Sequence, residues 1–284
     1  AIGLIPLSQL TIEVHPLSLN KISVFDQPKI YPLQLSTYIF GTDQSLQKDI
    51  VKELQDQFSE TSITRLLVVG DIMMGRYVGV KIARSGNPNH SFEYTANYLS
   101  SFDITVAQLE APLSGNVPLT SEGMILVAQP ETVAGLTNAG IDLVFNSSNH
   151  FGDDWSDGLE ENFQILKQNN ILYAGAGRNI SEAFSPQFIE KNNQKLGFLG
   201  FVSIMPDNYG ASLDQPGTAW IDLNSESDLS RVQTIIHDTK NKCDLLFVNF
   251  HWGTEYTPDP TPAQIKFAHA AIDAGADLII GTHP

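Results

Sequence analysis

The segments LLFVNFHWGTEY (245–256) and DLIIGTHP (277–284) each carry a run of apolar residues that leads directly into a histidine. Apolar runs of about four to six residues bounded by turn signals are typical of buried strands, so His251 and His283 should lie where strands end. Between them, residues 261–276 favour a helix that begins at a capping threonine. The sequence therefore predicts strand, helix and strand, with both histidines at one edge of a parallel pair.

Three earlier segments repeat this design of a buried strand that delivers polar groups at its end. They are RLLVVGDIMMGR (65–76), ITVAQLEAPLSG (104–115) and IDLVFNSSNHFGDD (141–154), which end in Asp71, in Gln108 and Glu110, and in Asn149, His150 and Asp153. One such ending alone is most often an ordinary turn. Five strand ends that carry carboxylate, amide and imidazole groups form a set of ligands that divalent metals accept. The pattern predicts a metal site at the edge of a sheet.

At these residues the sequence resembles the CapA family of bacterial capsule and poly-γ-glutamate synthesis proteins, in the calcineurin-like metallophosphoesterase superfamily. The matching stretches are GDIMMGR (70–76), QLEAPLSG (108–115), NHFGDDWSDGL (149–159), YAGAGRNISEA (173–183), NFHWGTEYTPDPTPAQ (249–264) and DAGADLIIGTHP (273–284). They occur in this order over about residues 64 to 284, and HWGTEY followed by PTPAQ is a specific combination.

The fold expected for residues 64–284, a CapA-type metallophosphoesterase-like domain, is α/β. Strand patterns alternate with helical stretches at 156–168, 226–240 and 261–274, which indicates a parallel or mixed sheet covered by helices. The resemblance implies a four-layer αββα metallophosphoesterase-like sandwich, with two sheets between helices and the metals at the sheet edge. Since the chain stops one residue after His283, we expect this domain to be C-terminally incomplete.

Residues 1–60 differ in kind from the rest and are expected to form a small N-terminal appendage. Prolines interrupt the short apolar stretches of residues 1–40, which fits loops and edge strands. Residues 45–59 place apolar side chains at helical spacing and favour an amphipathic helix. The segment weakly resembles the tail of a solute-binding domain, and a plain extension that packs on the main domain is an equal alternative. Because the chain opens on Ala1, we expect a piece of a longer precursor.

The composition excludes several classes of partner. The chain has 284 residues and a net charge of −16, and its 16 lysines and arginines are scattered. Nucleic acid and anionic lipid require clustered basic residues, so neither is an expected partner. No run of about 18 or more apolar residues occurs, so direct membrane insertion of this chain is not expected. The single cysteine, Cys243, allows no internal disulfide framework.

The resemblance to the superfamily implies five metal ligands in this sequence. They are Asp71, Glu110, Asn149, His251 and His283. Glu110 matches a carboxylate that bridges two metals, and Asn149 matches a ligand that binds through its amide oxygen. The cofactor expected from this set is a divalent metal ion, either Mn, Zn or Fe.

Two departures from the superfamily pattern bear on how many ions are held. Met73 stands where ordinary phosphoesterases carry a histidine ligand, and a thioether is a poor ligand for a hard cation. The last histidine of the fifth motif, which would follow His283, is absent from the chain. We therefore expect one ion to be held well by the four ligands other than Asp71, and a second ion to be held poorly.

The same resemblance assigns His150 as a general acid near the leaving oxygen, with Asp153 orienting its ring. Adjacent residues on an extended or turning backbone point their side chains apart, so Asn149 can face the metal while His150 does not. An imidazole held by a carboxylate keeps a proton more readily near neutral pH, which suits a general acid.

Two functions stay open from the sequence. The first is a CapA-like metal-dependent hydrolase of phosphoester or amide bonds, acting in extracellular capsule or poly-γ-glutamate metabolism. The alternative is a non-catalytic, metal-containing assembly or tethering protein for anionic capsule polymer. Met73 favours the second function, whereas Asn149, His150 and Asp153 favour the first.

The two functions share their expected partners and location. The partners are an anionic capsule polymer or its phosphorylated precursor, and membrane-bound capsule synthesis machinery. The expected location is extracellular or at the cell surface, with membrane anchoring through a part of the protein outside this chain.

Overall fold

The computed structural model describes residues 64–154, 156–204 and 207–283, and these fold into strands and helices of the α/β class. The first sheet is wholly parallel, with the strand order β1 (Leu66–Ile72), β2 (Ile104–Leu109), β3 (Leu143–Phe145) and β4 (Leu172–Ala174). The second has the order β10 (Leu278–Thr282), β9 (Leu245–His251), β7 (Gln194–Val202) and β6 (Gln187–Lys191), with only β6 antiparallel to its neighbour. A short antiparallel pair joins β5 (Ala176–Gly177) to β8 (Gly217–Thr218).

Helices connect most of these strands, as parallel neighbours require. The α-helices are α2 (Arg76–Ser85), α3 (Ala96–Leu99), α4 (Val133–Asn138), α5 (Ser156–Gln168), α6 (Ile180–Ala183), α7 (Glu226–Lys240) and α8 (Pro262–Asp273). Short 3-10 turns are η3 (His90–Phe92), η4 (Pro130–Thr132), η5 (Phe151–Asp154) and η6 (Asp207–Tyr209). None of the helices in the described part of the chain is long and apolar enough to cross a membrane.

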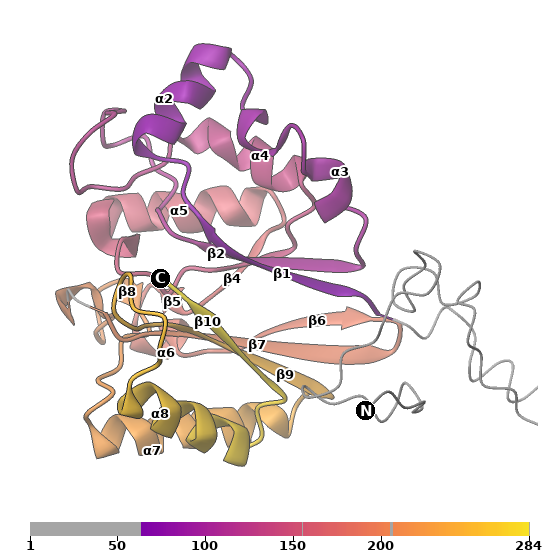
Figure 1. Ribbon diagram of the computed structural model, residues 1–284, viewed down its shortest axis with the longest axis vertical. Helices are drawn as coiled ribbons and strands as arrows, with labels where there is room; N and C mark the ends of the chain where they lie inside the picture. The colour runs from indigo at the N-terminus through magenta and orange to yellow at the C-terminus, as the bar shows by residue number, and fades with distance from the viewer. Residues whose placement is uncertain (1–63, 155, 205–206, 284) are drawn as a thin grey trace, which may run out of the picture. The chain divides into compact units, whose positions relative to one another are not determined.

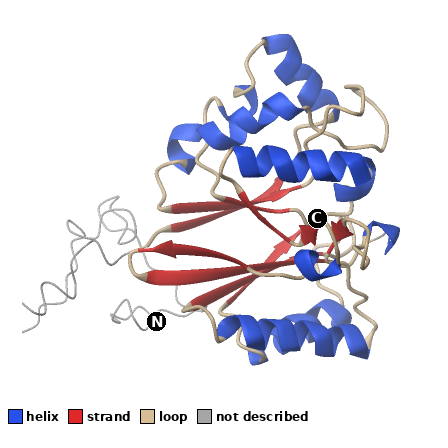
Figure 2. Ribbon diagram, turned by 180° about the vertical axis from the view of Figure 1, so that it is seen from behind, coloured by secondary structure: helices blue, strands red, loops and turns tan. Residues whose placement is uncertain are grey.

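The two large sheets face each other, and helices cover their outer faces. Figures 1 and 2 show α2 to α5 over the first sheet and α7 and α8 over the second. The chain completes the first sheet, β1 to β4, before it enters the second through the β6–β7 hairpin. Each sheet is therefore built from one continuous half of the described chain.

Strand β2 shows how the alternation of side chains divides the core. Ala107 and Leu109 pack into the cluster under the helices of the first sheet, whereas Ile104 and Val106 pack between the sheets. The cluster between the sheets also contains Phe198, whose ring centroid lies 6.5 Å from that of Phe145 on β3. Side chains of one strand thus alternate between two apolar layers, as the period of two demands.

The inner faces of both sheets become polar toward the carboxyl ends of their strands. On β2, Gln108 follows Val106 on the inner face, and on β9, Asn249 and His251 follow Phe247. Gln108, Asn249 and His251 are all fully buried. Buried polar side chains require partners, so this end of the layer between the sheets is specialised for polar contacts.

The helix and strands predicted around the two histidines are confirmed. Thr261 caps α8 by accepting a hydrogen bond from the backbone N–H of Gln264 at 3.2 Å, and the Gln264 side chain accepts from the N–H of Thr261 at 2.8 Å. Strands β9 and β10 are parallel, with Thr282 opposite His251. The α/β class is also confirmed. Residues 1–60 lie outside the described residues, so their expected role as an appendage stays a prediction.

A β-bulge lies in β1 just before Asp71. Val69 pairs with Ala107 and Asp71 pairs with Gln108, so Gly70 is an extra residue without a partner on β2. The strand then continues to Ile72, past the end that the sequence suggested at Asp71. Bulges bend a strand and re-aim its side chains, often next to functional sites.

Candidate metal centre

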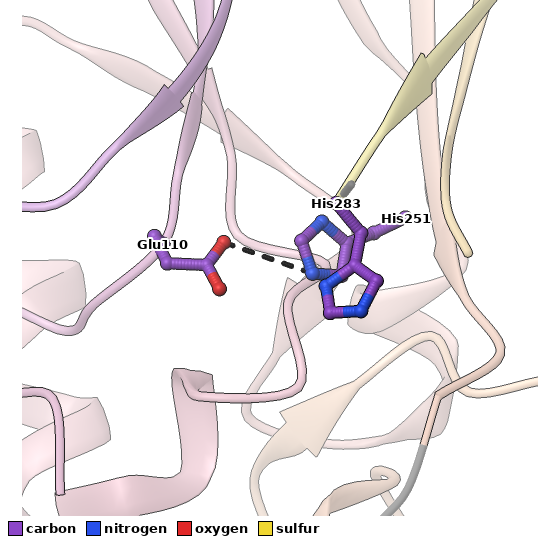
Figure 3. Close-up of side chains that lie close together, drawn as sticks. All are labelled: Glu110, His251 and His283. Atoms are coloured by element: carbon purple, nitrogen blue, oxygen red, sulfur yellow. Dashed lines mark ion pairs between the residues drawn. The ribbon is translucent and has the colours of Figure 1, made fainter. Parts of the chain in front are cut away.

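Three side chains meet at the carboxyl ends of strands from both sheets (Figure 3). Glu110, His251 and His283 each offer a ligand atom, and these atoms all lie within 4.8 Å of one another. Glu110 follows β2 directly, His251 is the last residue of β9, and His283 follows β10. The Nε2 atom of His251 lies 3.6 Å from Oε2 of Glu110. Three of the residues that the sequence suggested as metal ligands therefore lie close together in the structure.

Asn149 joins the group through its amide oxygen. Oδ1 of Asn149 lies 2.8 Å from Nε2 of His251, the same nitrogen that faces Glu110. Carboxylate, amide oxygen and imidazole nitrogen therefore surround one point. These groups together form a set that borderline and hard divalent cations accept.

The hydrogen bonding at this point fits a cation. Oε2 of Glu110 is buried and has no hydrogen-bond partner among the described residues. A buried acceptor without a donor is unfavourable, and Oδ1 of Asn149 and Nε2 of His251, which share a hydrogen bond in the metal-free chain, lie beside it. A divalent cation at this position would be contacted by all three atoms.

The pKa values reflect an acidic, buried site. Burial and then the charge of Asp71 raise the pKa of Glu110 to about 7. Burial, followed by the neighbouring imidazoles His283 and His150, lowers the pKa of His251 to about 3. Burial also lowers the pKa of His283. Near neutral pH the imidazole of His251 is therefore neutral, the form in which histidine binds metals.

Asp71 lies beside the cluster but outside the group of three. Its Oδ2 accepts a hydrogen bond from the backbone N–H of His283 at 3.1 Å, and its Oδ1 lies 3.7 Å from Nδ1 of His251. Burial raises the pKa of Asp71 against the opposing effect of this N–H group. The carboxylate thus holds the backbone of His283, whose φ of 84° is in the left-handed region.

Met73, the residue in place of an expected histidine ligand, packs against the hydrophobic core under the helices of the first sheet. Its thioether is therefore engaged in apolar packing. Met73 therefore supplies no nitrogen ligand to a second ion that would bind beside Asp71.

His150 is held by Asp153. Its Nδ1 lies 2.9 Å from Oδ2 of Asp153. That carboxylate also accepts hydrogen bonds from the backbone N–H of Leu126 at 2.6 Å and from the hydroxyl of Tyr209 at 3.2 Å. Burial opposes protonation of His150, but the hydrogen bond and charge of Asp153, together with the charge of Glu110, outweigh it and raise the pKa.

Two arginines of the matching motifs, Arg76 and Arg178, differ in their surroundings. Arg178 is committed to other side chains, since it pairs with Glu160 at 2.7 Å and Glu182 at 3.0 Å. Arg76 is half-buried and has no hydrogen bond or ion pair with any of the described residues, and its charge acts on His150. Arg76 is thus the one of the two whose guanidinium is available to a ligand.

Two residues of the site, Thr282 and Tyr209, have roles that the sequence did not reveal. Thr282 contacts Nδ1 of His251 at 3.1 Å, and its inward direction follows from its spacing of two from Ile280. Tyr209 reaches Asp153 from η6, a segment without a periodic pattern. Glu255, which lies 3.9 Å from Nε2 of His283, is 61% exposed at the side chain and borders the site from the loop after β9.

Comparison with known proteins gives one family. Residues 65–284 match the family model described as bacterial capsule synthesis protein PGA_cap. A capsule biosynthesis protein CapA of Bacillus anthracis is 31% identical over 223 residues, which cover 77% of this chain and 54% of that protein. A PGA biosynthesis protein CapA of Bacillus subtilis (strain 168) is 29% identical over 219 residues, covering 76% and 56% respectively.

A more distant relative is described as a probable polyglutamine synthesis accessory protein of Mycobacterium tuberculosis. It is 22% identical over 257 residues, which cover 77% of this chain and 68% of that protein. The chain spans about half the length of the two Bacillus relatives, with 54% and 56% of them covered.

Proposed function

Because the chain belongs to the bacterial capsule synthesis protein PGA_cap family, we propose that residues 64–283 form a metal-dependent hydrolase domain of capsule or poly-γ-glutamate metabolism. Its relatives in two Bacillus species are described as capsule or PGA biosynthesis proteins. The metallophosphoesterase-like, four-layer form of the fold belongs to the same proposal. The bond cleaved is a phosphoester or an amide.

The observation that carries the proposal is the pair formed by His150 and Asp153 next to Glu110, Asn149 and His251. A protein that only held a metal would need the last three groups. The pair adds an imidazole fixed at Nδ1 by a carboxylate that is itself held by Leu126 and Tyr209. Such a carboxylate fixes the ring orientation and stabilises the protonated imidazole, as general acid–base catalysis requires.

The residues that would hold the ion are Glu110, Asn149, His251 and His283. When bound, a divalent ion would supply Lewis acidity toward the scissile group and toward water. Asp71 would act on this set through the backbone of His283, to which its carboxylate is hydrogen-bonded.

His150 would deliver a proton from Nε2 to the leaving oxygen or nitrogen, because Nδ1 is taken by Asp153. Arg76 would bind a negatively charged group of the substrate, since it is a cation without a protein partner in the described structure. Its position beside His150 places positive charge where an acidic site would otherwise repel an anion. These roles suit a substrate that carries phosphate or carboxylate groups.

The proposed partners are an anionic capsule polymer or its phosphorylated precursor and the membrane-bound machinery that makes the polymer. The proposed location is the cell surface or the extracellular space, with anchoring through a part of the protein outside this chain. The capsule functions of the Bacillus relatives support these assignments.

A second candidate function is a non-catalytic protein that tethers anionic capsule polymer through the bound metal. Two observations favour it. Met73 packs in the hydrophobic core in place of a histidine ligand, which leaves the second metal of a two-metal hydrolase poorly supported. The relative from Mycobacterium tuberculosis is described as an accessory protein.

The deciding experiment measures hydrolysis and polymer binding in the same samples. The purified chain is loaded with Mn²⁺, Zn²⁺ or Fe²⁺ and assayed on phosphomonoesters, phosphodiesters and γ-glutamyl amides. The His150→Gln variant and a sample treated with chelator are assayed in the same way. The hydrolase predicts turnover that chelation and His150→Gln both abolish, while the variant keeps its metal. Polymer binding that survives His150→Gln but disappears with chelator, without any turnover, would establish the tether instead.

A further inference from the structure

Two large apolar side chains lie exposed beside the candidate metal centre. Met124 is 79% exposed and Ile125 is 51% exposed, in the segment between β2 and η4. The next residue, Leu126, is buried in the core under the helices of the first sheet, and its backbone N–H donates to Oδ2 of Asp153 at 2.6 Å. The same oxygen lies 2.9 Å from Nδ1 of His150. The chain therefore carries two exposed apolar side chains directly before a residue that is bound to the proposed acid pair.

The segment that carries these side chains packs closely against the start of α2. A Cβ atom at Gly75 would lie 2.6 Å from the backbone oxygen of Val127, and one at Gly79 would lie 2.8 Å from Cδ1 of Leu119. Only glycine permits so close an approach at these two positions. Arg76, the first residue of α2, stands between the two glycines in the sequence. The apolar segment and Arg76 are therefore neighbours at one border of the site.

Arg76 combines a strained backbone with an uncommitted charge. Its φ of 49° lies in the left-handed region, which is uncommon for a residue with a long side chain. Strain of this kind is typically retained at functional sites. The guanidinium has no hydrogen bond or ion pair with the described residues, and its charge acts on His150. An unpaired cation and an apolar surface thus lie side by side next to the proposed acid.

We propose that the site binds phosphate monoesters of aliphatic chains, with the phosphate beside Arg76 and the chain across Met124 and Ile125. This inference rests on the proposed function and names its class of substrate. A γ-glutamyl polymer carries a carboxylate on each residue and would bring charge against the two apolar side chains, which costs desolvation energy. An aliphatic chain gains from the same contact. The surface therefore favours the phosphoester over the amide.

The charge distribution favours a single amphiphilic molecule over a membrane surface. Glu122 is the one charged residue among residues 115–127, and the chain has a net charge of −16. Anionic membranes are bound by clusters of lysine and arginine, which this segment lacks. One phosphate group, in contrast, requires one well-placed cation, and arginine suits phosphate because its planar guanidinium donates two parallel hydrogen bonds.

The test is calorimetric binding of methyl-, butyl- and octylphosphonate, which resist hydrolysis, to the Mn²⁺-loaded chain below micelle-forming concentrations. A fully buried methylene tightens Kd about fourfold, and a half-covered one about twofold. Octylphosphonate should therefore bind about tenfold or more tightly than butylphosphonate. Met124→Ser and Ile125→Ser should each lower this ratio several-fold and leave methylphosphonate unchanged. Ile272→Ser, 47% exposed near the end of α8, is the matched control and should leave the whole series unchanged.

Arg76→Gln should weaken all three phosphonates several-fold and keep the ratio of octyl to butyl, because it removes the contact with the anion alone. The inference is wrong if octylphosphonate binds no more tightly than butylphosphonate in the unmodified chain. It is also wrong if Met124→Ser and Ile125→Ser both keep the ratio.

Two further measurements identify other occupants of the apolar surface. Sedimentation with vesicles of phosphatidylcholine and phosphatidic acid tests a membrane, and sedimentation equilibrium tests a second copy of the chain. Either association, lost in Met124→Ser and accompanied by a flat phosphonate series, would overturn the inference. The proposed function fails separately: a chain without turnover on any substrate that keeps the dependence on chain length is not a hydrolase, but its class of ligand stands.

Discussion

Nε2 of His251 lies 2.8 Å from Oδ1 of Asn149, although 102 residues separate the two in the sequence. His251 ends a strand of the second sheet, and Asn149 follows a strand of the first. The contact therefore depends on how the two sheets are docked, and each variant at this site reports on that docking as well as on a single side chain.

Asn149→Ala should weaken binding of Mn²⁺ or Zn²⁺ by about tenfold or more, because it removes the amide oxygen that faces Nε2 of His251. The measurement is isothermal titration calorimetry on the chelated chain. Asn241→Ala, at the exposed C-cap of α7, is the matched control and should bind metal as the unmodified chain does. Equal affinity in both variants would exclude Asn149 as a ligand.

Asp153→Asn should move the alkaline limb of the kcat profile to lower pH. The carboxylate raises the pKa of His150 by its hydrogen bond and its charge, so its removal lowers that pKa. A general acid works only while protonated, and activity is then lost earlier as the pH rises. The pH–rate profiles of the two chains under saturating substrate provide the check. An unchanged alkaline limb would mean that another group donates the proton.

The same pair has a consequence for stability. The folded-state pKa of His150 is above its ordinary value of 6.5, so the stabilisation by Asp153 is fully present below about pH 6.5 and is lost as the pH rises through the raised value. Thermal unfolding of the chelated chain should therefore show a larger effect of Asp153→Asn at pH 6 than at pH 9.

Glu110→Gln should stabilise the metal-free chain at pH 8 but not at pH 4.5. The pKa of Glu110 is raised from 4.5 to about 7, so the folded chain loses stability as the pH rises from about 4.5 to about 7, where this carboxyl ionises in the unfolded chain but stays protonated in the folded one. The amide avoids that loss, which is roughly 3 kcal/mol for a pKa raised from 4.5 to about 7. Urea unfolding of chelated samples at both pH values measures it. A destabilised variant at pH 8 would contradict the raised pKa.

Arg76→Gln should weaken inhibition by inorganic phosphate several-fold and raise KM for anionic substrates more than it lowers kcat. The guanidinium has no protein partner among the described residues, so its removal should disturb little else. Arg84→Gln, at the exposed end of the same helix α2, is the control of equal charge. If both variants change phosphate inhibition equally, the effect is one of net charge and not of a contact at the site.

The sequence predicted correctly those strands and helices whose ends are marked by nearby residues. Each apolar run ending in a polar group proved to be a strand, and the cap of Thr261 predicted the start of α8 correctly. Parallel pairing of β9 and β10 then followed from the helix between them. These features depend on short stretches of chain, which is why they could be predicted from residue patterns.

The rest depends on contacts between distant segments. The bulge at Gly70 has no signature beyond a glycine, yet it decides where Asp71 lies relative to β2. The contact of Tyr209 with Asp153 and that of Thr282 with Gln108 arise only when separate segments dock. The apolar patterns of the strands also could not show which strands share a sheet, because side chains alternate with a period of two in the strands of both sheets.

The division of the described chain into two consecutive sheets sets an order of events during synthesis. A ribosome releases the N-terminal half first, so β1 to β4, with Glu110 and Asn149, emerge before β9 and β10 exist. The proposed set of metal ligands is complete only after His283 has emerged, so an ion bound by these residues would be acquired late. A nascent chain that stalls before β9 would expose the apolar face of the first sheet, the kind of surface that chaperones bind.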